Sequence, residues 1–172
     1  MSPRRLKTDP QILEIPPQKM AEVVGKGSPD KVFSELMPAL YGSVYTLKVG
    51  LKKEGLPTFK VSPPRARYPD ALGSPKDNWT IIMGIPIPDD TSELPQKVPG
   101  IEVKLTTWDY GPTAQILHIG PYDAEEPTVN RLLSHITENG YEVAGPHEEE
   151  YLTRPDAKVM KTIIRFQVKK VS

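Results

Sequence analysis

The chain has 172 residues, no cysteine, and 22 basic against 22 acidic side chains. Its length indicates a single domain with room for a buried core. The lack of cysteine excludes disulfides and thiolate sites, and the zero net charge gives no sign of a nucleic-acid or membrane partner. The N-terminal stretch MSPRRLKTDPQ has no apolar segment of a secretory signal, and no apolar run reaches the length of a membrane span, so we expect a cytoplasmic protein.

The first half of the chain predicts a strand, a helix and two further strands. The first strand covers about residues 14–26. Ser28 and Pro29 suit the N-cap and first position of a helix, whose apolar residues recur at spacings of three and four. Gly55 is the expected end of this helix. Strands at residues 58–62 and 79–87 complete this half.

The second half predicts the same succession of elements. A strand covers about residues 103–119. Asp123 can cap the following helix, with Glu126 as its capping-box partner, and an Asn-Gly pair ends the helix. Two strands follow, at residues 141–152 and 161–169.

Two pairs of similar segments support an internal repeat. AEVVGKGSP, which starts at Ala21, is similar to AQILHIGPY, which starts at Ala114. TIIMGIPI, from Thr80, is similar to TIIRFQVK, from Thr162. Because both pairs occur in the same order at similar offsets, a duplicated unit is the simplest interpretation.

We therefore predict an α+β fold made of a duplicated β-α-β-β module within one domain, residues 1–172. Repeat 1 covers about residues 11–88, a linker covers 89–100, and repeat 2 covers about 101–170. With pseudo-twofold symmetry, the two copies would form an antiparallel sheet with both helices on one side and a ligand groove between the repeats.

A row of three glutamates in the predicted strand at residues 141–152 is the sharpest candidate for a site. Strand alternation places Glu149 and Tyr151 on one face, with Glu148 and Glu150 on the other. A bulge before the row would exchange the two faces. The row is either a solvated acidic edge or a carboxylate held for a ligand. In an apolar groove such a carboxylate would have a raised pKa and would attract a cation.

Several aromatic residues are candidate ligand contacts or core residues. Trp79 begins a strand and suits either the core or the wall of a ligand site. Tyr41 and Tyr45 lie one helical turn apart and would either line a groove or pack under the sheet. Tyr122, at the start of the second helix, would cover one end of a groove.

Two further sets of residues are assigned no site. Trp108 and Tyr110 flank a turn, so we expect them at the surface or at a rim. The three histidines, His118, His135 and His147, do not have metal-ligand spacing, so we expect neither a metal site nor a cofactor.

Five segments of the chain resemble the GyrI-like small-molecule-binding domain family. They are KLTTWDYGPTAQILHIGPYDAEEPTVNRL, GPHEEEYLTRPD and KTIIRFQV, together with MAEVVGKGSPD and LMPALYGSVYTLKVGLKK, which resemble its stand-alone subgroup without a DNA-binding region. The resemblance extends from about Gln11 to Val168 and is most specific in the His-Ile-Gly-Pro-Tyr block and the Glu-x-Tyr-Leu strand. It implies the same duplicated β-α-β-β fold.

The resemblance also implies a function. Similar domains in multidrug-sensing regulators bind large, flat, often cationic compounds, with a glutamate at the base of an aromatic groove; that glutamate corresponds to Glu149 here. We therefore expect a binding protein for aromatic or cationic xenobiotics, without direct nucleic-acid or membrane binding, and leave a protein partner or homodimer open. The expected ligand contacts are Glu149, Tyr151, Trp79, Tyr45, Tyr41, Tyr68 and Tyr122.

A second interpretation is an enzyme. Some stand-alone members are similar hydrolases that open the cyclopropane ring of DNA-alkylating natural products. In that case Glu149 would act on a water molecule while the flat substrate stacks on Trp79. In the segment SPPRARYPDALGSPKDNW before its third strand, this chain has only two aromatic residues, Tyr68 and Trp79. Hydrolase-like members carry more there, so this segment favours binding. A protein-interaction domain would need a large exposed apolar patch, which the sequence does not identify.

Overall fold

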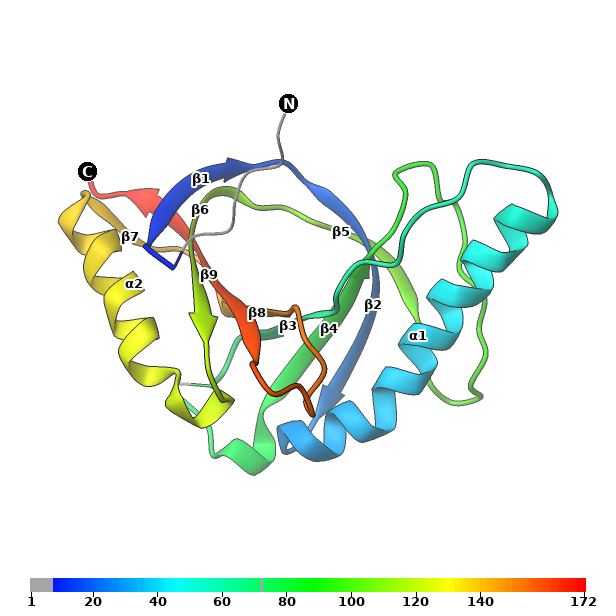
Figure 1. Ribbon diagram of the computed structural model, residues 1–172, viewed down its shortest axis with the longest axis horizontal. Helices are drawn as coiled ribbons and strands as arrows, with labels where there is room; N and C mark the ends of the chain where they lie inside the picture. The colour runs from blue at the N-terminus through cyan, green and yellow to red at the C-terminus, as the bar shows by residue number, and fades with distance from the viewer. Residues whose placement is uncertain (1–7, 72) are drawn as a thin grey trace. The chain divides into compact units, whose positions relative to one another are not determined.

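The computed structural model describes residues 8–71 and 73–172. In this part of the chain it is an α+β protein of antiparallel strands with two α-helices (Figure 1). The chain divides into two compact units: the first is Pro17–Asp109, and the second combines Met1–Pro16 with Tyr110–Ser172. Most of the charged N-terminal stretch, residues 1–7, lies outside the described residues. Among the described helices, none is long and apolar enough to cross a membrane.

The first unit is a four-stranded antiparallel sheet with one helix. Its strands lie in the order β3-β4-β2-β5. Their bounds are β2 Gln18–Lys26, β3 Arg65–Tyr68, β4 Thr80–Pro86 and β5 Lys104–Trp108, with the short 3-10 helix η1 at Lys76–Asn78. The predicted strand at residues 79–87 is confirmed. The one predicted at 58–62 is wrong: the strand starts at Arg65, after Pro63 and Pro64, which have no N–H to donate to a sheet.

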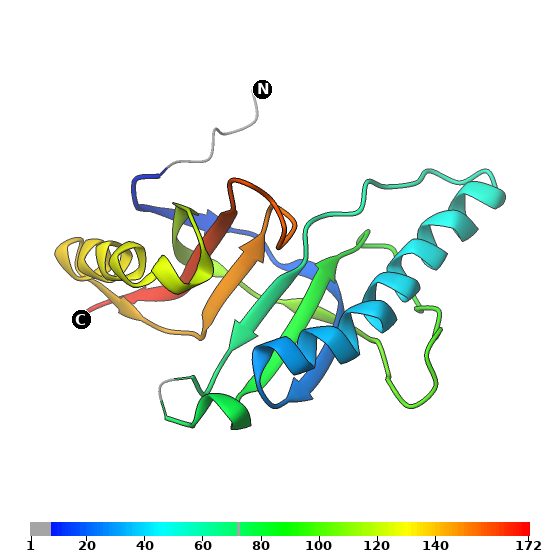
Figure 2. The same cartoon turned by 60° about the horizontal axis from the view of Figure 1, so that its bottom comes forward.

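Helix α1, Pro29–Lys53, packs on one face of this sheet (Figure 2). Ser28 is its N-cap residue and Pro29 its first residue, as the sequence predicts. Val32, Leu36 and Leu40 are buried against the strands. Gly25 of β2 allows this close approach, since a Cβ there would lie 2.6 Å from Leu36 Cδ1.

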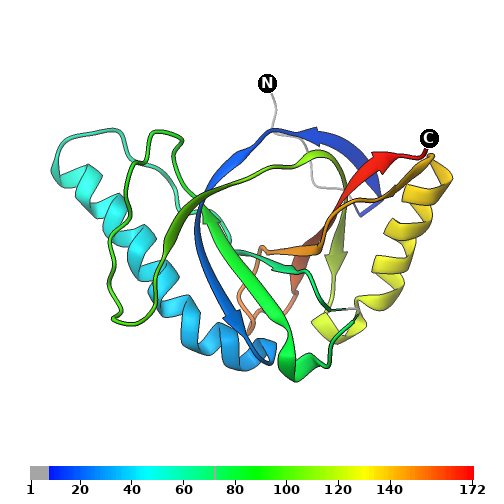
Figure 3. The same cartoon turned by 180° about the vertical axis from the view of Figure 1, so that it is seen from behind.

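The connection between β4 and β5 contains the predicted linker at residues 89–100, which has no helix or strand. Figure 3 shows this connection running beside α1. Its Lys97 packs against α1 at Gly42, where a Cβ would lie 3.4 Å from Lys97 Cβ.

The second unit also contains a four-stranded antiparallel path and one α-helix. Its strands lie in the order β1-β6-β9-β8, and β7 also pairs with β9. The bounds are β1 Gln11–Ile15, β6 Gly111–Ile119, β7 Tyr141–Val143, β8 His147–Tyr151 and β9 Lys161–Lys170; the 3-10 helix η2 is Tyr122–Ala124 and helix α2 is Glu126–Glu138.

Helix α2 buries its apolar side against the even-numbered residues of β6 and β9. Leu132 and Ile136 form one core with Ile116, Ile164 and Phe166 of the sheet. The predicted cap at Asp123 is wrong, because Asp123 belongs to η2 and Glu125 is the N-cap residue of α2. The side chain of Glu125 is thereby placed at the start of α2, close to the sheet.

Three predicted strands are each interrupted. The strand at residues 14–26 breaks at Pro16 and Pro17 into β1 and β2, and the strand at 103–119 breaks before Gly111 into β5 and β6. The strand at 141–152 breaks into β7 and β8 around Gly145, where a Cβ would lie 2.5 Å from Gln167 Oε1. After these breaks β1 pairs with β6, and β5 pairs with β2.

Trp108 and Tyr110, expected at the surface, are buried instead, with 3% and 5% of their surface exposed. Trp108 Nε1 donates a hydrogen bond of 2.9 Å to Glu22 Oε1. The Arg67 guanidinium carbon lies 4.0 Å from the centre of the Trp108 ring. The burial depends on Gly84 of β4, because a Cβ at that position would lie 2.8 Å from the indole ring.

Replacing Gly84 by alanine should therefore destabilise the protein by about 1–3 kcal/mol, since the added methyl overpacks Trp108 and Met20. Gly50→Ala is the matched control: apart from the nearby backbone of α1 itself, no atom of the described residues lies within 4 Å of its Cβ position, so it should stabilise by about 0.5–1 kcal/mol. Urea unfolding of both variants measures these differences. If Gly84→Ala is as stable as the wild type, the packing of Trp108 on β4 is contradicted.

Candidate functional site

Strand β8 distributes its three glutamates between the two faces of the sheet in the second unit. Glu149 is paired with Ile164 of β9, whose side chain lies in the α2 core. Glu148 is paired with Arg165, so Glu148 and Glu150 lie on the opposite face. Burial alternates along β8 in the same way. The predicted alternation of the three side chains is confirmed.

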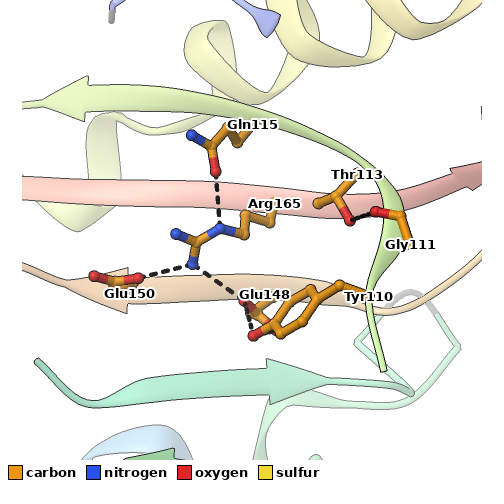
Figure 4. Close-up of polar contacts among 7 residues, drawn as sticks. All are labelled: Tyr110, Gly111, Thr113, Gln115, Glu148, Glu150 and Arg165. Atoms are coloured by element: carbon orange, nitrogen blue, oxygen red, sulfur yellow. Dashed lines mark hydrogen bonds and ion pairs between the residues drawn. The ribbon is translucent and has the colours of Figure 1, made fainter. Parts of the chain in front are cut away.

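Glu148 and Glu150 belong to a buried ionic network around Arg165 (Figure 4). Arg165 Nη1 donates a hydrogen bond of 3.2 Å to Glu148 and lies 2.9 Å from Glu150 Oε1. The Tyr110 hydroxyl donates to the Glu148 carboxylate, with contacts of 3.1 and 3.0 Å, and Arg165 Nε donates to Gln115 at 3.0 Å. These carboxylates are 2% and 8% exposed, so they form part of the protein interior.

Glu149 lies in a different environment, together with Glu125 and His147. His147 Nε2 and Glu149 Oε2 are 2.8 Å apart, and the Glu149 side chain is 12% exposed. The Glu125 carboxyl group lies beside that of Glu149. One candidate ligand atom from each of the three residues lies within 4.8 Å of the other two.

Two tyrosine rings border these carboxyl groups. Tyr122 and Tyr151 pack edge to face, with ring centres 5.6 Å apart and an interplanar angle of 77°. Burial raises the pKa of Tyr122, and the negative charges of Glu149 and Glu125 raise it further. Tyr122 is 40% exposed, so the cluster can be reached from solvent. We call Glu125, His147, Glu149, Tyr122 and Tyr151 the Glu149 cluster.

The His-Ile-Gly-Pro-Tyr block holds this cluster in place. His118 is buried, with Nδ1 2.7 Å from Thr128 Oγ1 and Nε2 3.0 Å from the Pro121 carbonyl oxygen. Gly120 turns the chain with a φ of 139°, a conformation that favours glycine, and its N–H donates to the Met160 carbonyl. This turn leads directly into η2, which carries Tyr122.

The other predicted site residues form two separate pairs in the first unit. Tyr68 and Trp79 pack edge to face at 5.8 Å, and Trp79 Nε1 donates a hydrogen bond to the Ser74 carbonyl. Tyr41 and Tyr45 lie 6.1 Å apart on α1, with Tyr45 half exposed. Thus the structure brings Glu149, Tyr151 and Tyr122 together and places the remaining four in pairs of their own.

The sequence-based reasoning missed Glu125 and His147. His147 lies two residues before Glu149 on the same strand, so the alternation that placed Glu149 also places His147 beside it. Glu125 had no comparable signal, because only the fold of the turn after β6 brings it to β8. An open depression between Pro10 and the outer side of α2, near Arg131 and His135, includes none of the predicted site residues.

The fold and these motifs agree with the comparison to known families: the chain belongs to the GyrI-like family, whose GyrI-like small molecule binding domain matches residues 8–169. The predicted family is confirmed, and the class of protein is a small-molecule-binding domain. No curated protein matches the chain.

Solved structures show the same fold. An uncharacterized conserved protein from Listeria innocua is 26% identical, with a TM-score of 0.83 over 95% of this chain and 94% of the other. A hydrolase from Listeria innocua is 24% identical, with a TM-score of 0.81 over 96% and 94%. The C-terminal domain of EcmrR is 17% identical, with a TM-score of 0.66 over 95% and 98%.

The Glu125 carboxyl group should make stability depend on pH. Burial above all, together with the neighbouring Glu149 carboxylate, raises the pKa of Glu125 from 4.5 to about 9. Between about pH 5 and about pH 9 the unfolded chain has lost this proton while the folded chain keeps it. The folded state then binds more protons than the unfolded state. The contribution of Glu125 to the free energy of unfolding therefore falls as pH rises through this window.

Glu125→Gln should remove this contribution, so the stability of the variant should fall less steeply between about pH 5 and about pH 9 than that of the wild type. Urea unfolding across this range, with a chelator present, measures both slopes. Glu126→Gln is the control, because Glu126 is the exposed neighbour in the first turn of α2. Parallel profiles for wild type and Glu125→Gln would contradict a protonated Glu125.

Proposed function

We propose that the protein binds small organic cations with an aromatic ring system at the Glu149 cluster. The observation that carries this proposal is the position of two carboxyl groups, Glu149 and Glu125, beside the edge-to-face pair of Tyr122 and Tyr151. A carboxylate attracts a cation more strongly in a partly desolvated place than in water. Each tyrosine face adds a cation–π term of about 0.5–2 kcal/mol.

The opposite face of β8 is a poorer candidate. Glu148 and Glu150 are buried and contact the guanidinium of Arg165, so a ligand would have to displace an existing ion pair. Breaking such a pair is costly. Glu149 is less deeply buried, and its neighbour Tyr122 is open to solvent.

Membership of the family supports a small molecule as the ligand. The carboxyl groups of Glu149 and Glu125 support a positive charge on that ligand. Aromatic or cationic xenobiotics fit both, which suits a cytoplasmic protein that senses or sequesters such compounds. Direct binding of nucleic acid is not part of the proposal, since the chain has no net positive charge. Trp79, Tyr68, Tyr41 and Tyr45 stay predicted ligand contacts, tested by substitution in the same binding assay.

We also infer that the two units are copies of one β-α-β-β module. In each unit the last strand of the module lies between the strand that precedes the helix and the strand just before it in the chain: β4 lies between β2 and β3, and β9 lies between β6 and β8. Superposing β2 and α1 on β6 and α2 in an experimental structure tests the duplication. Strands that fail to coincide under any single rotation would refute it.

A flat aromatic cation such as rhodamine 6G should bind the wild type, and Glu149→Gln should weaken binding by about 10-fold to 100-fold. The lost contact is charge-assisted and contributes about 1.5–3 kcal/mol. Tyr151→Leu should also weaken binding, because it removes a ring face. Calorimetric titration measures the affinities.

Glu142→Gln is the control for this experiment, since Glu142 is exposed on β7 and pairs with Lys169. Unchanged affinity in a folded Glu149→Gln variant, with a loss in Glu150→Gln, would place the ligand on the other face of β8 and overturn the proposed site.

A hydrolase is the second candidate function, because Glu125, with its raised pKa, lies beside Glu149 and the two can supply an acid and a base. A water molecule would add its oxygen to a cyclopropane carbon while Glu149 accepts a proton. The electron pair of the broken carbon–carbon bond would then receive a proton from Glu125. The reaction is a net addition of water.

Incubation with a cyclopropane-bearing DNA alkylator separates an enzyme from a binder. An enzyme gives ring-opened product over many turnovers, and Glu149→Gln lowers the rate by at least ~10²-fold because it removes the base. A binder protects the compound stoichiometrically, and mass spectrometry recovers it intact. Many turnovers in Glu149→Gln would show that Glu149 is not the base.

A further inference from the structure

We propose that Glu125, His147 and Glu149 form a binding site for a divalent transition-metal ion. Each residue offers one ligand atom, and these atoms all lie within 4.8 Å of one another. His147 Nε2 and Glu149 Oε2 are already 2.8 Å apart. With metal–ligand bonds of about 2.0–2.2 Å, ligand atoms lie about 3 Å apart when adjacent and about 4.3 Å apart when opposite. The spacing of the three ligand atoms, all within 4.8 Å of one another, is therefore compatible with one shared ion.

An unsatisfied buried atom is independent support for a ligand at this place. Glu125 is 8% exposed, and its Oε1 atom has no hydrogen-bond partner among the described residues. Buried carboxyl oxygens normally have a partner, and leaving one without costs free energy. A metal ion would satisfy this oxygen and would neutralise the charges of the two carboxylates when both are ionised.

The donor set indicates the class of metal. One imidazole and two carboxylates suit Zn²⁺, Mn²⁺, Fe²⁺ or Co²⁺, whereas Ca²⁺ and Mg²⁺ prefer oxygen ligands throughout. Two ionised carboxylates and a neutral imidazole carry a charge that a divalent ion neutralises. Three protein ligands also leave coordination positions open for water or a ligand.

The surroundings hold the ligands in orientation. The His147 ring packs edge to face on Phe166, with ring centres 5.2 Å apart, and this contact fixes the imidazole plane. Glu149 is fixed by the pairing of β8 with β9, and Glu125 by its place at the start of α2. Groups that fix the orientation of metal ligands raise the affinity for the ion.

This site shares Glu149 with the proposed organic-cation site, but the two depend on different residues. His147 is a ligand only of the metal, and the ring of Tyr151 contacts only the organic cation. Substitution of these two residues therefore tests the proposals separately.

The experiment titrates chelator-treated protein with Co²⁺, followed by visible absorption, and with Zn²⁺, followed by calorimetry. The wild type should bind one equivalent of either ion. His147→Gln and Glu125→Gln should each lower the affinity for the ion by about 100-fold or more. Loss of a residue that only orients a metal ligand already lowers affinity by about 10–100-fold, and these two residues are ligands themselves. His135→Gln and Glu126→Gln, neighbouring residues of α2 outside the cluster, should bind like the wild type.

Circular dichroism of each variant shows whether it is folded, and the Zn²⁺-induced rise of the melting temperature gives a second readout. Wild-type affinity in folded His147→Gln and Glu125→Gln, or no Zn²⁺ binding by the wild type at about millimolar concentration, would overturn the metal site. Tyr151→Leu should keep Zn²⁺ binding. If the protein binds Zn²⁺ in a way that depends on His147 but binds no aromatic cation, the metal site is supported and only the proposed function is refuted.

Discussion

The guanidinium of Arg165 lies between two glutamates of β8, and this contact determines the role of the third. Two carboxylates on one face of a strand repel each other, and burial strengthens the repulsion. Arg165 compensates both, with contacts of 3.2 Å to Glu148 and 2.9 Å to Glu150. Removing one partner of such a buried pair typically costs about 3–5 kcal/mol. A slip of β8 by one residue would place Glu148 and Glu150 on the apolar side under α2, so the ion pairs also fix the register.

With the register fixed, Glu149 must point to the α2 side, where it is the acidic residue that β8 contributes. The turn after β6 then provides its neighbours. His118 holds the Pro121 carbonyl, Gly120 turns the chain, and η2 places Tyr122 and Glu125 at the start of α2. The two faces of β8 therefore differ: Glu148 and Glu150 lie in the protein interior, and Glu149 belongs to a cluster that is partly open to solvent.

Much of this arrangement could be predicted from local patterns. The alternation along β8, the start of α1 at Ser28 and Pro29, and the order of elements in each half depend on residues close in sequence. The family resemblance extended these patterns to a fold. Pro63 and Pro64 also indicate the start of the third strand. Because proline has no N–H to donate to a sheet, a strand is expected to begin after them, at Arg65.

The features that were missed depend on contacts between distant segments. Trp108 is buried because Glu22 and Gly84 lie beside it only once β5 has paired with β2 and β2 with β4. Likewise, Glu125 reaches Glu149 only through the turn after β6 and the position of α2 on the sheet. Neither spacing nor periodicity contains this information, so both residues had to be found in the structure.

The most direct test of the division between the two faces of β8 is an NMR titration of protein labelled with ¹³C at the glutamate carboxyl carbons. A flat aromatic cation is added, and the signals of Glu125, Glu148, Glu149 and Glu150 are followed one by one. The account predicts that the Glu149 and Glu125 signals shift with ligand concentration while those of Glu148 and Glu150 stay in place. Shifts confined to Glu148 and Glu150, with Glu149 unaffected, would contradict it.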